Sequence, residues 1–235
     1  LPKTSIQELK EDGRVQPRKF DFATILFTDF KDFTKITGDL KPVEVLKKLG
    51  YFFTKFDQIL EEHGVEKIKT IGDAYMCVGG VPIRNKSNPI DTVLVALKML
   101  RVVEEQKKED IKNGNPPWEI RIGINTGVLI AGVIGEKKFA YDVWGNAVNV
   151  ASRMESVSAP QTITISQKTK ECIAPYIETI SMEKLHVKSL GETQTYKVLR
   201  IKPEYSKDKE GYYSTSKLND DFHRSMLRLK NKSLF

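Results

Sequence analysis

Apolar residues recur along the chain at two different spacings, and this alternation constrains the fold more than any other feature of the sequence. They return every three or four positions over 42–64 and 93–103, which predicts two long amphipathic helices. The first helix is expected to end at Gly64 and to bury a face that includes Val43 and Leu46. Short runs rich in β-branched and aromatic residues predict strands at 22–28, 65–71, 75–78, 119–125, 128–134, 139–143, 162–165, 177–187 and 194–201.

Short turn sequences separate several of these strands. Gly72-Asp73 lies between the second and third predicted strands, which are predicted to form a hairpin, and Thr126-Gly127 separates the fourth and fifth. Two shorter helices are predicted at 146–156 and 167–173. Strands joined partly by hairpins and mixed with helices indicate an α+β fold, in which helices pack on a sheet.

The length of 235 residues suits one domain with flanking segments. Residues 1–20 are polar and contain two prolines, so they are interpreted as a linker from an upstream region, which would be a sensor or a membrane segment. The start at Leu1 is interpreted in the same way, as a sign of a fragment. Residues 21–201 are predicted to form the domain, and 202–235 a C-terminal tail.

Composition excludes several classes of protein. Hydrophobic residues make up 40% and charged residues 29%, as in soluble globular chains, and no apolar stretch reaches the roughly 20 residues of a membrane helix. The two cysteines, Cys77 and Cys172, form no disulfide framework or metal cluster, which favours a reducing, cytoplasmic compartment. The formal charge of +7 comes from lysines interleaved with acidic residues, as on a solvated surface. An RNA-binding sheet would need paired exposed aromatic residues, which the sequence does not show, so no nucleic-acid partner is expected.

Two aspartates occupy positions suited to phosphate chemistry. Asp29 ends a predicted buried strand just before a helical start, and Asp73 lies in the predicted hairpin turn. Each has a simpler interpretation, Asp29 as a helix cap and Asp73 as a turn residue. If their strands are neighbours, both carboxylates lie at one edge of the sheet, and Mg²⁺ prefers such oxygen ligands beside a phosphate. Two metal ions could then polarise the attacking and leaving oxygens of a phosphoryl displacement.

A second group of polar residues lies on the predicted helix 146–156. Asn149 and Arg153 are four residues apart, so they project from one face, where an arginine could stabilise charge on phosphate oxygens. On spacing alone they could equally be a solvated polar face. Lys69, four residues before Asp73, would by itself be interpreted as a solvated strand residue.

Three segments together resemble the catalytic domain of class III nucleotide cyclases. They are TDFKDFT at 28–34, EKIKTIGDAYM at 66–76 and YDVWGNAVNVASR at 141–153, and the resemblance extends over roughly residues 20–200 in the family's order. It is greatest to bacterial-type adenylate cyclases. The resemblance implies a ferredoxin-like, palm-type sheet with flanking helices, working as a head-to-tail homodimer with active sites at the interface.

The resemblance also implies a metal and phosphate site. The aspartates that match Asp29 and Asp73 hold two Mg²⁺ or Mn²⁺ ions in the family, with the backbone carbonyl that matches Phe30. The backbone that follows Asp29, here including Phe33 and Thr34, binds the phosphates. The cofactors expected from the resemblance are therefore two divalent metal ions.

The remaining site residues are implied in the same way. The residue matching Asn149 orients the ribose and the one matching Arg153 stabilises the transition state, both from the partner protomer. Lys69 and Asp142 match the pair that selects the base, and this combination is typical of adenylate cyclases, whereas guanylate cyclases typically have glutamate and cysteine. Lys188 matches a lysine that contacts the terminal phosphates, although the family's VKGKG element reads VKSLG here.

These matches predict an adenylate cyclase, which converts ATP into 3′,5′-cyclic AMP and pyrophosphate by attack of the ribose 3′-hydroxyl on the α-phosphorus. ATP and a second copy of the chain are the expected partners. The alternatives are a guanylate cyclase, or a catalytically silent cyclase-like module that only dimerises and regulates.

Overall fold

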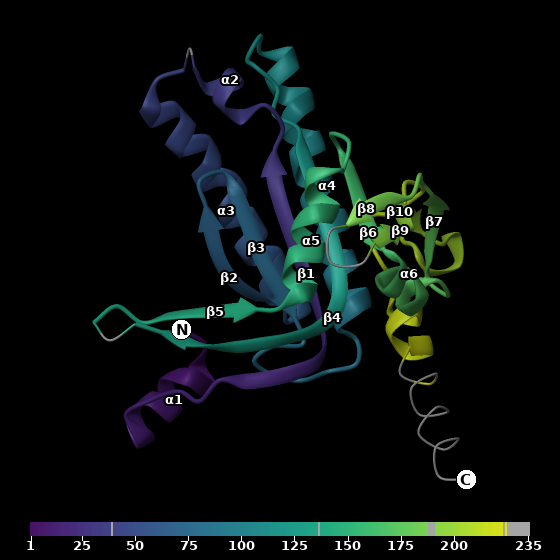
Figure 1. Cartoon of the computed structure of the whole chain (residues 1–235). Coiled ribbons are helices and arrows are strands. Elements are labelled where there is room, and N and C mark those ends of the chain that lie inside the picture. Colours follow the sequence, from purple (N-terminus) through teal and green to yellow (C-terminus); the bar gives the residue numbers. More distant parts are fainter. Residues whose placement is uncertain (39, 136, 188–190, 223, 225–235) are drawn as a thin grey trace.

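The computed structural model describes residues 1–38, 40–135, 137–187, 191–222 and 224. An eight-stranded sheet forms its centre (Figure 1), in the order β2–β3–β1–β4–β6–β10–β7, with β5 paired to the outer part of β4. The strands are β1 (Arg18–Phe30), β2 (Glu66–Ile71), β3 (Ala74–Gly79), β4 (Ile120–Ile134), β5 (Ala140–Trp144), β6 (Thr162–Ser166), β7 (Ile177–Ser181), β8 (Leu185–Val187), β9 (Gly191–Thr193) and β10 (Thr195–Ile201). The helices are α1 (Lys3–Asp12), α2 (Phe33–Thr37), α3 (Pro42–His63), α4 (Asn88–Lys112), α5 (Asn146–Ser156), α6 (Gln167–Ile173) and the 3₁₀ turn η1 (Pro203–Tyr205).

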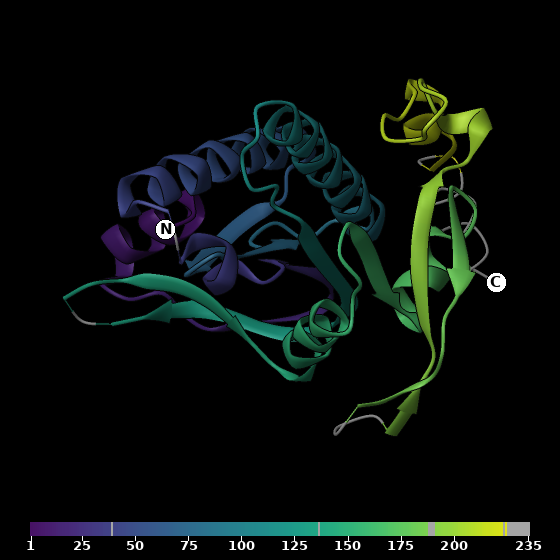
Figure 2. The ribbon, with the colours of Figure 1, turned by 90° about the horizontal axis from the view of Figure 1, so that it is seen from above.

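Helices cover both faces of the sheet. Viewed from above, α3 and α4 lie on one side and α5 on the other (Figure 2). The larger core lies between the sheet and the two long helices and contains a group of buried aromatic rings. The centroid of the Phe30 ring lies 5.1 Å from the ring centroids of both Phe52 and Trp118. A smaller core on the face of α5 includes Ile25, Leu129 and Ala147. This arrangement confirms the predicted α+β class.

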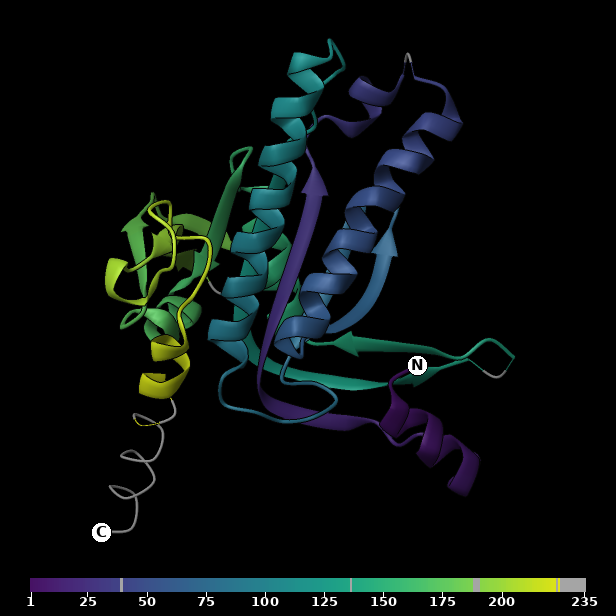
Figure 3. The same ribbon diagram turned by 180° about the vertical axis from the view of Figure 1, so that it is seen from behind.

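Both long helices are present, but α3 buries less of its length than the spacing predicts. Its buried residues begin at Phe52, whereas Val43 and Leu46 are 61% and 68% exposed. Val45, which lies between them, packs against the larger core, so the core-facing side of α3 (the helix is seen from behind in Figure 3) is rotated away from Val43 and Leu46. The spacing predicted the helix correctly, but it assigned the first turns of the buried face to the wrong residues. None of the helices in the described ranges is long and apolar enough to cross a membrane.

The predicted separation of two strands at Thr126-Gly127 is wrong, because β4 continues through these residues as one strand. Thr126 is buried opposite Thr24 of β1, and their hydroxyl oxygens are 2.9 Å apart. Gly127 makes close helix packing possible rather than a turn, since a Cβ atom there would lie 2.7 Å from the Cβ atom of Ala147 in α5. The hairpin with Gly72-Asp73 between β2 and β3 is confirmed.

Three other segments differ from their predictions. The proposed linker 1–20 contains α1 and the start of β1, and Arg18 forms an ion pair with Glu8 at 2.6 Å between Nη2 and Oε2. The single strand predicted at 177–187 is two strands, because β7 pairs with β10 while β8 pairs with β9. The composition of residues 177–187 does not show that the two halves of this segment pair with different strands.

The segment after β10, predicted as a tail, packs on the domain over residues 203–222. Leu218 and Phe222 are 0% and 7% exposed and belong to the larger core. The hydroxyl group of Tyr212 donates to Glu104 of α4, with 3.0 Å between the oxygens. Burial of these side chains indicates that the segment contributes to the stability of the domain.

We expect Leu218→Ala to lower the free energy of unfolding by about 2–5 kcal/mol, because it leaves a cavity at a fully buried position. Urea unfolding followed by circular dichroism measures the change. Asn219→Ala, at the exposed neighbouring position, is the matched control. Equal stability of the two variants would show that the segment does not pack on the core.

Candidate active site

The predicted aspartate pair lies at one edge of the sheet. β1 runs antiparallel to β3 with Thr28 opposite Tyr75, so Asp29 and the turn that holds Asp73 are adjacent. The backbone N–H of Phe30 donates a hydrogen bond to the Asp73 carboxylate. Partial burial raises the pKa of Asp73 above its usual value, and the negative charge of Asp29 raises it further.

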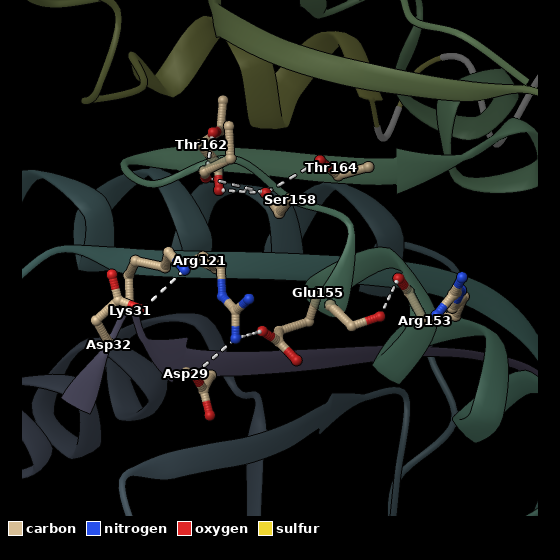
Figure 4. Close-up of polar contacts among 11 residues, drawn as sticks. Asp29, Lys31, Asp32, Arg121, Arg153, Glu155, Ser158, Thr162 and Thr164 are labelled. Carbon is tan, nitrogen blue, oxygen red and sulfur yellow. Dashed lines mark hydrogen bonds and ion pairs between the residues drawn. The ribbon is translucent and has the colours of Figure 1, made fainter. Parts of the chain in front are cut away.

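Arg121 and Glu155 join this edge, although the sequence analysis did not select them. Arg121 lies directly opposite Asp29 in the β1–β4 ladder, and its Nη2 atom donates to Asp29 Oδ1 at 2.8 Å. The same Nη2 atom lies 3.0 Å from Glu155 Oε1 (Figure 4). Burial raises the pKa of Glu155 to about 7, and the positive charge of Arg121 opposes that shift. A charged residue in an otherwise apolar strand was the available signal, but only the strand register shows what it faces.

The donor set at this edge is suited to a divalent cation. Asp29, Asp73 and Glu155 place three carboxyl groups around a single guanidinium, so negative charge is incompletely balanced. Within the described ranges, Arg121 Nε is buried without a hydrogen-bond partner, and Glu155 Oε1 is buried with no hydrogen bond beyond its ion-pair contact with Arg121. No group of three or more His, Cys, Asp or Glu residues in the described part of the chain is arranged to hold a metal. A cation would therefore depend on Asp29, Asp73 and backbone oxygen, with phosphate or water completing its coordination.

Phe33 and Thr34, the predicted phosphate contacts, begin the short helix α2 beside this edge. The Phe33 ring packs edge-on against Trp118, with centroids 5.4 Å apart, which anchors the start of α2 to the core. Thr34 is exposed. The preceding backbone is tied to β4, because the N–H of Lys31 donates to the carbonyl oxygen of Glu119 at 2.8 Å.

Lys69 and Asp142 lie together, although 73 residues separate them in the sequence. Lys69 Nζ of β2 donates to Asp142 Oδ2 of β5 at 2.6 Å. The other carboxylate oxygen, Oδ1, accepts from the N–H of Val143 at 2.9 Å, which holds the Asp142 side chain. The two side chains are 41% and 20% exposed, so a ligand could reach this donor and acceptor.

Asn149 and Arg153 lie four residues apart on α5, and both are exposed. Arg153 points away from the group of Asp29, Arg121 and Glu155 (Figure 4). Within one chain, the structure therefore does not bring Arg153 together with the aspartate pair. Lys188, the remaining predicted contact, lies outside the described residues.

Two glycines of β4 fix the position of α5. A Cβ atom at Gly123 would lie 1.9 Å from the backbone nitrogen of Glu155, and one at Gly127 would meet Ala147. The Asn125 amide group also donates to the carbonyl oxygen of Ala147 at 2.9 Å. Close contact at both ends of α5 determines where its polar side chains point.

Known proteins share this sequence pattern and fold. The family model of the adenylate and guanylate cyclase catalytic domain matches residues 15–200. The chain is 39% identical over 183 residues to the receptor-type guanylate cyclase gcy-23 of Caenorhabditis elegans, an alignment that covers 76% of this chain and 17% of that protein. It is 36% identical over 197 residues to an adenylate cyclase of Mycobacterium tuberculosis, covering 83% of this chain and 44% of that protein. The chain thus spans less than half the length of these relatives.

Solved structures show the same similarity. The catalytic core of a rhodopsin-guanylyl cyclase with converted specificity, in complex with ATPalphaS, superposes with a TM-score of 0.73 at 33% identity, covering 78% of this chain and 97% of that chain. The adenylyl cyclase CyaB from P. aeruginosa gives a TM-score of 0.74 at 27% identity, covering 78% and 95%. The similar proteins thus include both adenylate and guanylate cyclases.

We expect Gly123→Ala to destabilise the protein by about 1–3 kcal/mol or more, because the new methyl group would force α5 away from β4. Chemical denaturation provides the measurement. Gly132→Ala, in the same strand, is the control, since its Cβ atom would come no closer than 3.4 Å to Pro17. Equal effects of the two substitutions would contradict the close packing of α5.

Proposed function

Because this chain belongs to the adenylate and guanylate cyclase catalytic domain family, we propose that it converts ATP into 3′,5′-cyclic AMP and pyrophosphate. The observation that carries the choice of ATP is the contact between Lys69 and Asp142, which places one hydrogen-bond donor beside one acceptor. The adenine edge offers the complementary pattern, an acceptor at N1 and a donor at the N6 amine. Guanine has a donor at N1 and an acceptor at O6. The donor Lys69 would then face a donor, and the acceptor Asp142 would face an acceptor.

Lys69 and Asp142 would discriminate between adenine and guanine, because the wrong base leaves their polar groups without hydrogen-bond partners. Lys69 and Asp142 are partly buried and neutralise one another when no base is bound. Adenine replaces that contact with two hydrogen bonds, whereas guanine would break it without compensation. A site built on such hydrogen bonds can discriminate strongly, because the wrong ligand leaves polar groups unsatisfied.

The chain's own groups bind and orient the triphosphate. Asp29, Asp73 and the carbonyl group of Phe30 would hold two Mg²⁺ or Mn²⁺ ions, which supply Lewis acidity to the 3′-hydroxyl and phosphate oxygens when bound. Arg121, beside Asp29, adds a fixed positive charge at the same edge. The backbone at Phe33 and Thr34 follows directly after this edge and would bind the phosphates.

The orientation of Arg153 supports a homodimer with shared sites. Arg153 points away from the group of Asp29, Arg121 and Glu155 of its own chain, so it could act only on the site of a second copy. In a head-to-tail dimer, Asn149 would orient the ribose and Arg153 would stabilise charge on the transferred phosphate. Because one chain carries both halves, a homodimer would contain two complete sites.

Guanylate cyclase activity is the second candidate function, because receptor-type guanylate cyclases are among the similar proteins at 39% identity. Turnover with ATP and GTP in Mg²⁺ and Mn²⁺, with chromatographic identification of the cyclic product, tests both candidates. Cyclic AMP as the main product supports the proposal. Cyclic GMP would overturn the choice of base, and the absence of any cyclic product would favour a silent module.

Asp73→Asn should reduce turnover by a factor of roughly 100 or more, because the amide removes the negative charge that a metal requires. Steady-state cyclase assays measure the loss, and the thermal midpoint checks that the fold is retained. Asp32→Asn is the control, since Asp32 lies near the same edge but is exposed and paired with Lys31. Full activity of Asp73→Asn would refute the metal assignment.

Lys69→Glu combined with Asp142→Cys should shift the ratio of kcat/KM for ATP and GTP by roughly 100-fold toward GTP, because the donor at adenine N1 becomes an acceptor. Competition assays with both nucleotides provide the ratio. Lys67→Ala, on the same strand but paired with Asp57, should leave the preference unchanged. An unaltered ratio in the double variant would contradict the role of this pair.

A further inference from the structure

Glu155 occupies a place on α5 that neither the motifs nor the proposed reaction explains. It follows Arg153 by two residues, which is about 200° around the helix. Arg153 is exposed, whereas the Glu155 side chain is only 13% exposed and faces Arg121. The two charged side chains on α5 therefore face different environments, Arg153 the solvent and Glu155 the partly buried Arg121.

Arg121 is shared between two carboxylates through a single nitrogen. Its Nη2 atom lies 2.8 Å from Asp29 Oδ1 and 3.0 Å from Glu155 Oε1, and its side chain is only 22% exposed. Burying a guanidinium to this extent raises the free energy of the folded state unless a negatively charged group contacts it. When Asp29 binds a cation, it can no longer neutralise Arg121 fully. Glu155 then remains as the partner of Arg121.

We propose that Glu155 is a positioning residue, which holds Arg121 at the edge of the site of its own chain while Asp29 binds metal. This inference rests on the proposed cyclase function. The contact with Arg121 operates within one chain, whereas Arg153 of the same helix acts on the site of a second copy. The close approach of Gly123 to the Glu155 backbone keeps the carboxylate within reach of Arg121.

The charged groups that face Glu155 come from three elements. Arg121 lies on β4, Asp29 on β1 and Asp73 in the turn between β2 and β3. The pKa of Glu155 is raised to about 7, chiefly by burial, with Asp29 and Asp73 adding to the effect of burial and Arg121 opposing it. Arg121 favours the charged form of this carboxylate against the effect of burial, so the two side chains depend on each other.

The first test is Glu155→Gln, which keeps the shape of the side chain and removes its charge. We expect a loss of roughly tenfold or more in kcat/KM for ATP, with partial recovery in Glu155→Asp. Glu119→Gln is the matched control, because it removes the ion pair of Glu119 with Lys107 of α4, which does not include Arg121. A loss in Glu155→Gln that only follows reduced thermal stability, without recovery in Glu155→Asp, would overturn the positioning role.

The second test assigns Glu155 to one chain of the dimer. Asp73→Asn and Arg153→Ala chains are mixed in equal amounts. Half of the dimers then contain one chain of each kind, and each of these has one complete site of two, so the whole mixture should recover about a quarter of wild-type activity. That site takes its metal residues from the Arg153→Ala chain. Adding Glu155→Gln to this chain should abolish most of the recovered activity, and adding it to the Asp73→Asn chain should have little effect.

The outcomes separate the inference from the function on which it rests. Equal loss in both placements would show that Glu155 acts through the general packing of α5, and no loss in either would show that it has no role. Both results would overturn the inference while leaving the cyclase function intact. Failure of the two parent chains to complement would instead overturn the dimer with shared sites, and with it the assignment of Glu155 to its own chain.

Discussion

The close contact between α5 and β4 is the constraint on which the rest of the candidate site depends. Gly123 and Gly127 remove the side chains that would separate the helix from the strand, so α5 lies directly on the sheet. This contact brings Glu155 to Arg121 and leaves Asn149 and Arg153 on the outer surface. A larger distance between α5 and β4 would separate Glu155 from Arg121, whereas the exposed Asn149 and Arg153 would keep their surroundings.

Charge at the sheet edge is arranged around Arg121. The guanidinium alone balances part of the negative charge of Asp29, Asp73 and Glu155, and the raised pKa of Asp73 reflects burial and the remaining repulsion from Asp29. A metal ion bound between the carboxylates would relieve that repulsion. A second arginine at the position of the metal would neutralise the carboxylates permanently. The edge is therefore better suited to binding a cation together with a phosphate than to forming a closed salt-bridge network.

Features that depend on local sequence could be predicted, whereas those that depend on strand register could not. The turn at Asp73 and the shared face of Asn149 and Arg153 follow from spacing within a few residues. The position of Arg121 opposite Asp29 depends on the pairing of β1 with β4, which are 92 residues apart at this contact. For the same reason Thr126-Gly127 was wrongly predicted to separate two strands, because the buried partners Thr24 and Ala147 are distant in the sequence.

A helix that serves two sites is restricted in how it can move. Within the proposed dimer, α5 presents Glu155 to the metal half of its own chain and Arg153 to the reaction centre shared with a second copy. Any shift that brought Arg153 closer to that second copy would also displace Glu155 from Arg121, because both residues lie on one rigid element. The glycines beneath α5 therefore do more than improve packing, since in the proposed dimer they would fix the relative geometry of two active sites through a single helix.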